Sequence, residues 1–264
     1  MAASLFEPLG DERFLPTDAA RGPWSPHAMH GGPVSALLAG AAEPLLGELH
    51  PARVSVELLR PVPVTPLSVV TRLTRPGRKV RLVAVELSTE DGTRVATATV
   101  LGIRRARVAV PADPGPATAA PPGPDAVLSA PRAAVATGDD YDAFHNVGVE
   151  HRFVGGAFLE PGPAVDWIRL RVPVITGAEP TPLQRVMAAA DFGNGISGLA
   201  DFTQLVFINP DLTVHLHRLP VGEWVCLDAA TRLEGHGVGL AQSALWDERG
   251  QLGRALQSLL LEGR

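Results

Sequence analysis

The sequence predicts an α+β protein made of two similar halves that fold as one body. Residues 29–106 align with residues 187–264 without a gap. In each half, an apolar segment with helical spacing precedes an alternating strand and further strands joined by glycine turns. A long helix of this kind is expected to pack in the concave face of a curved antiparallel sheet. Two such units side by side would form one continuous sheet.

The helices are predicted from the spacing of apolar residues. The first begins at about Pro33, because proline is favoured in a first turn, and apolar residues recur at helical spacing as far as Leu49. The second begins at about Pro182 and resumes after a break at residues 193–195 to reach Leu199. Each helix is therefore expected to precede the alternating strand of its own half.

Alternating apolar and polar residues predict the strands, and a change of composition predicts the boundary between the halves. Residues 111–134 are dominated by proline, alanine and glycine, which have too few donors and too little large apolar surface to join a sheet. We therefore expect an N-terminal repeat over residues 1–110, a linker over 111–140 and a C-terminal repeat over 141–264. The strands expected are 54–59, 94–103, 147–153, 165–172, 212–217 and 252–261.

Composition excludes several classes of protein. The chain has 264 residues, 45% of them hydrophobic, and a formal charge of -5, so it has ample material for a core and no basic stripe for nucleic acid. Its longest apolar stretch, residues 33–46, is too short to span a membrane, and the N-terminus has no secretory pattern. The only cysteine, Cys226, cannot form an intrachain disulfide. We expect a soluble, cytoplasmic protein.

Four places in the chain, taken in order, resemble one known family. His30-Gly31-Gly32 opens the first helix, Arg60-Pro61 follows the first strand, residues 211–224 form a strand and turn, and Gln257 lies on the last strand. This order resembles the hot-dog-fold acyl-CoA thioesterases, in particular the double-hot-dog acyl-CoA thioesterase II type. The resemblance covers nearly the whole chain apart from the linker. It implies a double hot-dog fold, an acyl-CoA substrate and hydrolysis of a fatty or related acyl thioester to free acid and CoA, without a cofactor.

The resemblance also implies three catalytic residues. In the family, a water is the nucleophile, and it is held by an aspartate on the second helix, a threonine-like residue before the next strand and a glutamine. By position these are Asp191, Asn209 and Gln257. Asn209 departs from the family's hydroxyl residue, although an asparagine can still position water by hydrogen bonds.

The residues themselves leave other readings of these three side chains open. A thioester needs mainly a positioned water, a proton acceptor and donors for the oxyanion. Asp191 lies on the side of the helix expected to face the core, where an unpaired carboxylate is costly, but it could also be a turn carboxylate at the helix end. Gln257 could face solvent, and Asn209, which precedes Pro210, could simply shape a turn.

The start of the first helix is the predicted substrate-binding element. Gly31 and Gly32 precede the positive end of a helix dipole, where backbone N–H groups suit a developing oxyanion. Pro33 has no N–H, which leaves Gly32 and Val34 as donors. His30 could touch the substrate. A tight helix start and a structural histidine are the alternative readings.

The ungapped alignment makes the two halves unequal at the predicted site. It pairs Asp191 with Pro33 and Gln257 with Thr99. We therefore expect one competent site, with its carboxylate from the second half and its glycine amides from the first.

Two other functions and one other kind of site are consistent with parts of the sequence. The same cleft could bind an acyl group without hydrolysing it. A hot-dog enoyl-CoA hydratase would have an Asp and a His flanking an Asn-Pro pair, and both are missing around Asn209-Pro210. His215 and His217 face one side of a strand, but no third ligand has suitable spacing, so no metal site is predicted. These two histidines could instead lie at a contact within a homo-oligomer, such as a dimer of double hot-dogs, or simply face water.

Overall fold

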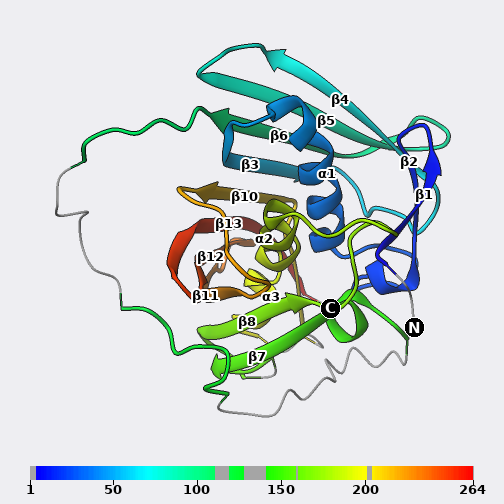
Figure 1. Cartoon of the computed structure of the whole chain (residues 1–264). Coiled ribbons are helices and arrows are strands. Elements are labelled where there is room, and N and C mark those ends of the chain that lie inside the picture. Colours follow the sequence, from blue (N-terminus) through cyan, green and yellow to red (C-terminus); the bar gives the residue numbers. More distant parts are fainter. Residues whose placement is uncertain (1–3, 111–118, 128–140, 159, 201–203, 264) are drawn as a thin grey trace.

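The computed structural model describes residues 4–110, 119–127, 141–158, 160–200 and 204–263 (Figure 1). The described chain forms a thirteen-stranded sheet in which every pair of neighbouring strands is antiparallel. The sheet curves around two helices, α1 and α2, which lie side by side on its concave face (Figure 1). This is the predicted α+β architecture of two helix-and-sheet repeats.

The first half contains the predicted helix and two strands that the sequence analysis did not expect, β1 and β2, ahead of it. Its elements are β1 (Phe6–Gly10), β2 (Arg13–Pro16), η1 (Asp18–Ala20), α1 (Gly31–Leu46), β3 (His50–Leu58), β4 (Leu67–Arg75), β5 (Val80–Thr89) and β6 (Arg94–Ile103).

The second half repeats this order, with additional short elements around its helix. Its elements are η2 (Phe144–Gly148), β7 (Val149–Gly155), β8 (Ala164–Leu170), α2 (Pro182–Ala190), α3 (Gly193–Ile196), β9 (Leu205–Ile208), β10 (Asp211–Leu216), β11 (Val225–Glu234), β12 (Val238–Asp247) and β13 (Gly250–Gly263).

The two halves join through one pair of strands, β3 and β10. Across this junction Val54 pairs with Val214 and Val56 with Leu212, and all four side chains are fully buried. On either side of the junction the order is the same, β3-β6-β5-β4 in one direction and β10-β13-β12-β11 in the other. One continuous sheet therefore results, because the cross-strand pairs extend a single core through the centre of the molecule.

The ungapped alignment is correct for the strands and wrong for the helices. It maps β5 directly onto β12, but α1 begins at Gly31 and α2 at Pro182, which the alignment does not pair. Pro33 lies in the first turn of α1, whereas Asp191 caps the C-terminus of α2, so the two are not equivalent. The reason is that α3 and β9 lie between the helix and β10 in the second half, without changing the strand register.

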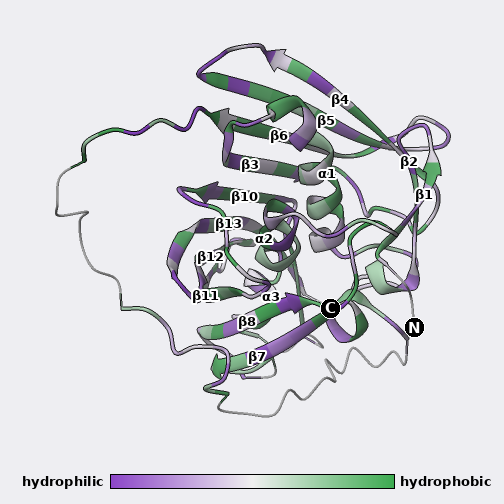
Figure 2. Cartoon of the chain, in the orientation of Figure 1, coloured by the Kyte–Doolittle hydropathy of each residue, from purple (hydrophilic) through white to green (hydrophobic). Residues whose placement is uncertain are grey.

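Helix α1 forms the centre of the core. Val34, Leu37 and Leu38 are fully or almost fully enclosed, because α1 packs both on its own strands and on α2. Figure 2 shows the apolar residues of the sheet alternating with polar ones, as expected when only one face of a strand is covered. Within the described ranges, no helix is long and apolar enough to cross a bilayer.

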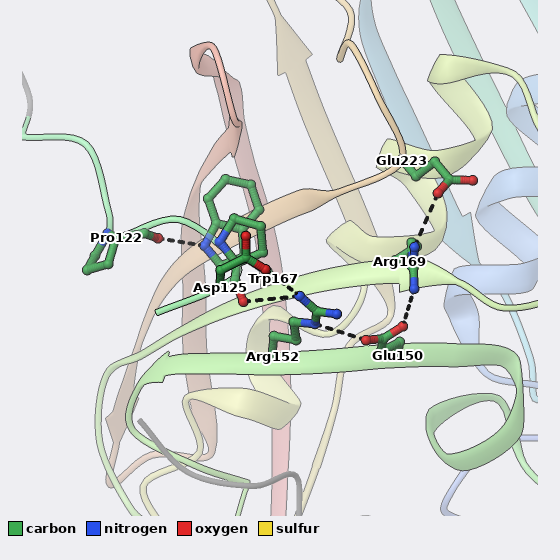
Figure 3. A network of polar contacts seen from close by, with 8 residues as sticks. Pro122, Asp125, Glu150, Arg152, Trp167, Arg169 and Glu223 are labelled. Atoms are coloured by element: carbon green, nitrogen blue, oxygen red, sulfur yellow. Dashed lines mark hydrogen bonds and ion pairs between the residues drawn. The ribbon is translucent and has the colours of Figure 1, made fainter. Parts of the chain in front are cut away.

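Most of the predicted linker, residues 111–118 and 128–140, lies outside the described residues. The part between them, residues 119–127, lies along β7 and β8 of the second half (Figure 3). The repeat and linker boundaries given above stay a prediction.

Two contacts hold this part of the linker. The Trp167 indole N–H donates a hydrogen bond to the Pro122 carbonyl over 2.8 Å, and the Arg152 guanidinium pairs with Asp125 at 2.9 Å (Figure 3). Arg152 also lies over the Trp224 ring, 4.6 Å from its centroid. These contacts attach the linker to a small apolar cluster on the side of the sheet away from the helices.

Candidate active site

A cavity of about 360 Å³ lies where the two halves meet, and residues of both halves line it. Five of the predicted site residues line this cavity: His30, Gly31, Val34, Asp191 and Asn209. The rest of the wall is mainly apolar and includes Trp24, Met29, Leu58, Val62, Phe158, Phe192, Phe207 and Ile208.

Asp191 lies at the C-terminus of α2 and is buried, with 4% of its surface exposed. The Asn209 side-chain amide donates a hydrogen bond to Asp191 Oδ1 over 2.8 Å. The Gln257 amide donates to the Asp191 carbonyl over 3.1 Å and to Oδ1 over 3.3 Å. The structure therefore brings the three predicted catalytic residues together from α2, the β9–β10 turn and β13.

Gln257 is held at both ends of its amide. Its Oε1 accepts a hydrogen bond from the Asn194 backbone N–H over 3.0 Å. A side chain at Gly193 would clash here, since its Cβ would lie 2.8 Å from Gln257 Oε1 and 2.8 Å from Ser243 Oγ. The glycine break after α2 thus lets the chain approach β13 closely and fixes the orientation of Gln257.

The predicted glycine pair lies directly against the end of α2. A Cβ on Gly31 would lie 2.6 Å and 2.8 Å from the two Asp191 carboxylate oxygens, and a Cβ on Gly32 would lie 2.5 Å from the Ala188 carbonyl oxygen. Only glycine allows this approach without movement of a neighbour. The carboxylate of the second half therefore faces the start of α1 in the first half, as the sequence predicts.

His30 makes the contact that the sequence analysis missed. Its Nδ1 lies 2.9 Å from Asp191 Oδ2 and 3.0 Å from the Gly32 backbone nitrogen. One nitrogen cannot donate to the carboxylate and accept from the amide at the same time. With Asp191 ionised, the favourable arrangement has the proton on Nδ1 and donates it to Asp191, which leaves the Gly32 N–H without its acceptor.

The Phe192 ring lies between the His30–Asp191 pair and a second histidine–aspartate pair, His151 and Asp166. The Phe192 ring lies 4.6 Å from the His30 ring and 4.8 Å from the His151 ring. His151 Nδ1 is 2.5 Å from Asp166 Oδ2, and Asp166 is fully buried. Burial raises the pKa of Asp166, although its pair with His151 acts in the opposite direction. No sequence pattern predicted this pair, because His151 lies on β7 and Asp166 on β8.

His145, on η2, also lines the cavity and was not predicted. Burial, and then the charges of His30 and His151, lowers the pKa of His145 to about 4. The ring is therefore neutral in the folded protein over most of the physiological pH range.

This shift predicts a loss of stability in mild acid. As pH falls below the ordinary histidine pKa of 6.5, His145 binds a proton in the unfolded chain. In the folded protein it stays neutral until about pH 4. Between about pH 7.5 and pH 5 we expect wild type to lose about 2 kcal/mol more unfolding free energy than His145→Gln. Urea unfolding at both pH values measures this difference. Asp166 titrates in both proteins, so its contribution cancels, and an equal loss in both would contradict the prediction.

Two profiles of one family match the chain. The acyl-CoA thioesterase N-terminal domain matches residues 20–102, and the acyl-CoA thioesterase C-terminal domain matches residues 113–261. A search of curated protein sequences finds no significant match.

Solved structures share the fold over almost the whole chain. A Thermobifida fusca protein assigned as a thioesterase II is 21% identical, with a TM-score of 0.73 and coverage of 98% of this chain and 96% of its own. A hot-dog-fold protein of unknown function from Alicyclobacillus acidocaldarius is 17% identical (TM-score 0.72; coverage 99% and 97%). The acyl-CoA thioesterase II TesB2 of Mycobacterium marinum is 16% identical (TM-score 0.62; coverage 98% and 96%).

The two profiles agree with two related halves, and the solved structures share the fold of the whole chain. The two profiles together cover most of the sequence, and only residues 103–112 separate them. The chain has the double hot-dog fold and belongs to the acyl-CoA thioesterase family of thioester hydrolases.

Proposed function

We propose that this protein hydrolyses fatty or related acyl-CoA thioesters to the free acid and CoA, using a water that Asp191 deprotonates. The observation that carries the proposal is the buried Asp191 carboxylate at the wall of an apolar cavity, facing the glycine pair of the other half. A carboxylate in such a place is costly unless it is hydrogen-bonded or functional, and Asp191 lines the cavity directly.

The neighbours of Asp191 support a role as general base. Asn209 and Gln257 both donate to Oδ1, so this oxygen is held in place. Oδ2 faces His30, and it has a further lone pair for a water O–H. In the reaction the water oxygen bonds to the thioester carbon, Asp191 takes the proton, and the C–S bond then breaks to release the thiolate. The thiolate takes up the proton as CoA leaves.

The start of α1 supplies candidates for the oxyanion donors. When His30 Nδ1 donates to Asp191, the Gly32 N–H is released and lies at the positive end of the α1 dipole, next to the Gly31 N–H. Val34 lines the cavity, but it lies at the end of the first turn of α1, where its N–H is used for hydrogen bonding within the helix. We therefore assign Gly31 and Gly32 to the oxyanion, His30 to positioning Asp191, and Val34 to contact with the acyl group.

Thiol release from a panel of acyl-CoAs tests the proposal. We expect CoA to appear with saturable kinetics in the presence of wild type. Binding of acyl-CoA without thiol release would favour a non-catalytic binding protein. Hydration of an enoyl-CoA without thiol release would favour a hydratase. Either result would overturn the proposal.

Arg60 gives a separate prediction about the CoA part of the substrate. It is exposed, and it is the one Arg or Lys among the residues that line the cavity in the described chain. Because CoA carries phosphate groups, Arg60→Ala should raise KM for acyl-CoA roughly five-fold, as expected for one exposed ion pair, with kcat unchanged. The same acyl group on N-acetylcysteamine, which has no phosphate, should show no change.

A matched control is Arg232→Ala, an exposed arginine on β11 away from the cavity. Its kinetic constants should equal those of wild type. Equal effects of Arg60→Ala on both thioesters would show that Arg60 does not contact the phosphates.

A further inference from the structure

Six exposed basic side chains gather at one corner of the sheet, and none of them lines the cavity. Three belong to the end of β4 and the turn that leads to β5, and three directly follow β6. The two segments are neighbours, because Val80 pairs with Ile103 and the Arg104 backbone N–H donates to the Lys79 carbonyl over 2.8 Å (Figure 1). Each basic run is short in the sequence, and the tertiary structure combines them. We call the six side chains the basic corner: Arg75, Arg78, Lys79, Arg104, Arg105 and Arg107.

The sequence around the basic corner has no acidic residues. Neither residues 58–85 nor residues 92–112 include an Asp or a Glu. Among the described residues, none of the six cations forms an ion pair. Exposed arginines elsewhere on the same sheet do form ion pairs, and Arg72 and Arg94 both pair with Glu86. The basic corner is therefore a local excess of positive charge and not part of a balanced network of surface charges.

Two carboxylates from α1 and the residues after it lie near part of the basic corner. Glu43 and Glu48 line a hollow together with Arg104 and Arg105, and the described side chains form no ion pair across it. Glu43 instead accepts a hydrogen bond from the Thr181 hydroxyl over 2.7 Å. Two carboxylates cannot balance six cations, although the chain as a whole has a charge of -5. A basic patch on an acidic protein indicates an anionic partner.

Apolar side chains are interleaved with the cations that follow β6. The side chains of Ile103, Val108 and Val110 are 43%, 73% and 75% exposed. Cations mixed with exposed apolar side chains suit the surface of an anionic bilayer, where the cations meet lipid phosphates and the apolar groups enter the head-group boundary. Single-stranded nucleic acid would favour aromatic side chains for stacking, and residues 67–80 and 103–110 contain none.

We propose that the basic corner binds the surface of bilayers that contain anionic phospholipids, with its six cations at the lipid phosphates and Val108 and Val110 in the head-group boundary. Long-chain acyl groups also partition into bilayers. Binding there would bring the protein close to the substrates of its proposed function.

The basic corner is remote from the proposed reacting centre. Arg81, on β5 beside the corner, donates to the last carbonyl groups of α1, while Gly31 at the other end of this helix meets Asp191. A helix of 16 residues is about 24 Å long. Substitutions in the basic corner should therefore leave the chemistry at Asp191 unchanged.

Sedimentation with vesicles tests the inference. At low ionic strength, wild type should partition onto vesicles of phosphatidylcholine and phosphatidylglycerol, and not onto vesicles of phosphatidylcholine alone. Each basic residue near an anionic surface contributes about five-fold, so a variant with Arg104→Gln, Arg105→Gln and Arg107→Gln should lower the partition coefficient roughly 10²-fold.

The control loses the same charge outside the basic corner. It combines Arg171→Gln, Arg232→Gln and Arg254→Gln, three exposed arginines without ion pairs in the described chain. Its partition coefficient should stay close to that of wild type, because these residues do not face the bound bilayer. Circular dichroism and thermal unfolding show that each variant folds, and the comparison of the two vesicle types needs wild type alone.

A second variant distinguishes a bilayer from a soluble polyanion. Val108→Ser with Val110→Ser keeps all six cations, so it should bind heparin as wild type does. It should partition less onto the anionic vesicles, because the apolar side chains no longer enter the head-group boundary.

Several results would overturn the inference. These are equal partition of wild type onto neutral and anionic vesicles, an unchanged coefficient in the Arg104, Arg105 and Arg107 variant, or an equal loss in the control. Binding to heparin, to RNA or to an acidic protein without binding to anionic vesicles would also overturn it, since the partner would then be a soluble polyanion.

The proposed function is tested separately in the same variants. Thiol release from an acyl-N-acetylcysteamine, a thioester without phosphate, should be equal in wild type and in all three variants. If wild type releases no thiol from this thioester or from acyl-CoA, the hydrolase proposal fails, and the vesicle measurements still decide whether the basic corner binds anionic bilayers.

Discussion

Asp191→Asn should lower kcat for acyl-CoA hydrolysis by roughly 10²- to 10⁴-fold, the usual contribution of a positioned general base. The substitution keeps the size of the side chain, and the Asn oxygen can still accept from Asn209 and Gln257, which now hold Asp191 Oδ1. It removes the group that takes the proton from water. KM should change little, because the cavity wall that holds the acyl group is unchanged.

The control for this prediction is Asp228→Asn, a conservative change of an exposed carboxylate on β11. It should retain wild-type kcat. Steady-state thiol release gives kcat and KM for both variants, and urea unfolding shows whether Asp191→Asn stays folded. If Asp191→Asn retained kcat within about three-fold of wild type, a factor below the range expected of a general base, Asp191 would not be the base.

The strands that follow the helix in each half were predictable because the repeat is preserved in their residues. The alternation in β3 and β10 puts Val54, Val56, Leu212 and Val214 on one face, and these residues pair across the junction. The helices were harder to align, because α2 ends at Ala190 and the chain then takes a second short helix and an additional strand. An insertion of this kind leaves strand periodicity intact, so a gap-free alignment did not detect it.

The candidate site was only partly predictable, for a similar reason. Asp191, Asn209 and Gln257 came from a family resemblance, and the structure brings their side chains together. The pair of His30 with Asp191 joins different halves, and no spacing along the chain reports such a contact. His145 lies in a segment without period-2 or helical spacing, so its place in the cavity wall follows only from the tertiary structure.

The glycine pair also explains why the Asp191 carboxylate and the start of α1 can lie so close together. Gly31 meets the end of a side chain, while Gly32 meets the backbone of α2 at the Ala188 carbonyl and also the Phe144 ring. A clash with a side-chain terminus can be relieved by movement of that side chain. A clash with helix backbone requires the two helices to separate, which costs packing throughout the centre of the core.

Gly31→Ala and Gly32→Ala should therefore fail in different ways. The Cβ of Gly31→Ala would displace the Asp191 carboxylate, and a displacement of about 1 Å can lower kcat/KM by about 10²-fold. The free energy of unfolding should change little. Gly32→Ala should lower the unfolding free energy by about 1–3 kcal/mol, because Phe144 and α2 must both move. Gly235→Ala, where a Cβ meets nothing within 4 Å, is the control for both measurements.

If Gly31→Ala kept full thiol release with normal stability, the close approach of Asp191 to the start of α1 would not be needed for the reaction. The assignment of Asp191 and the glycine pair as the reacting centre would then be wrong.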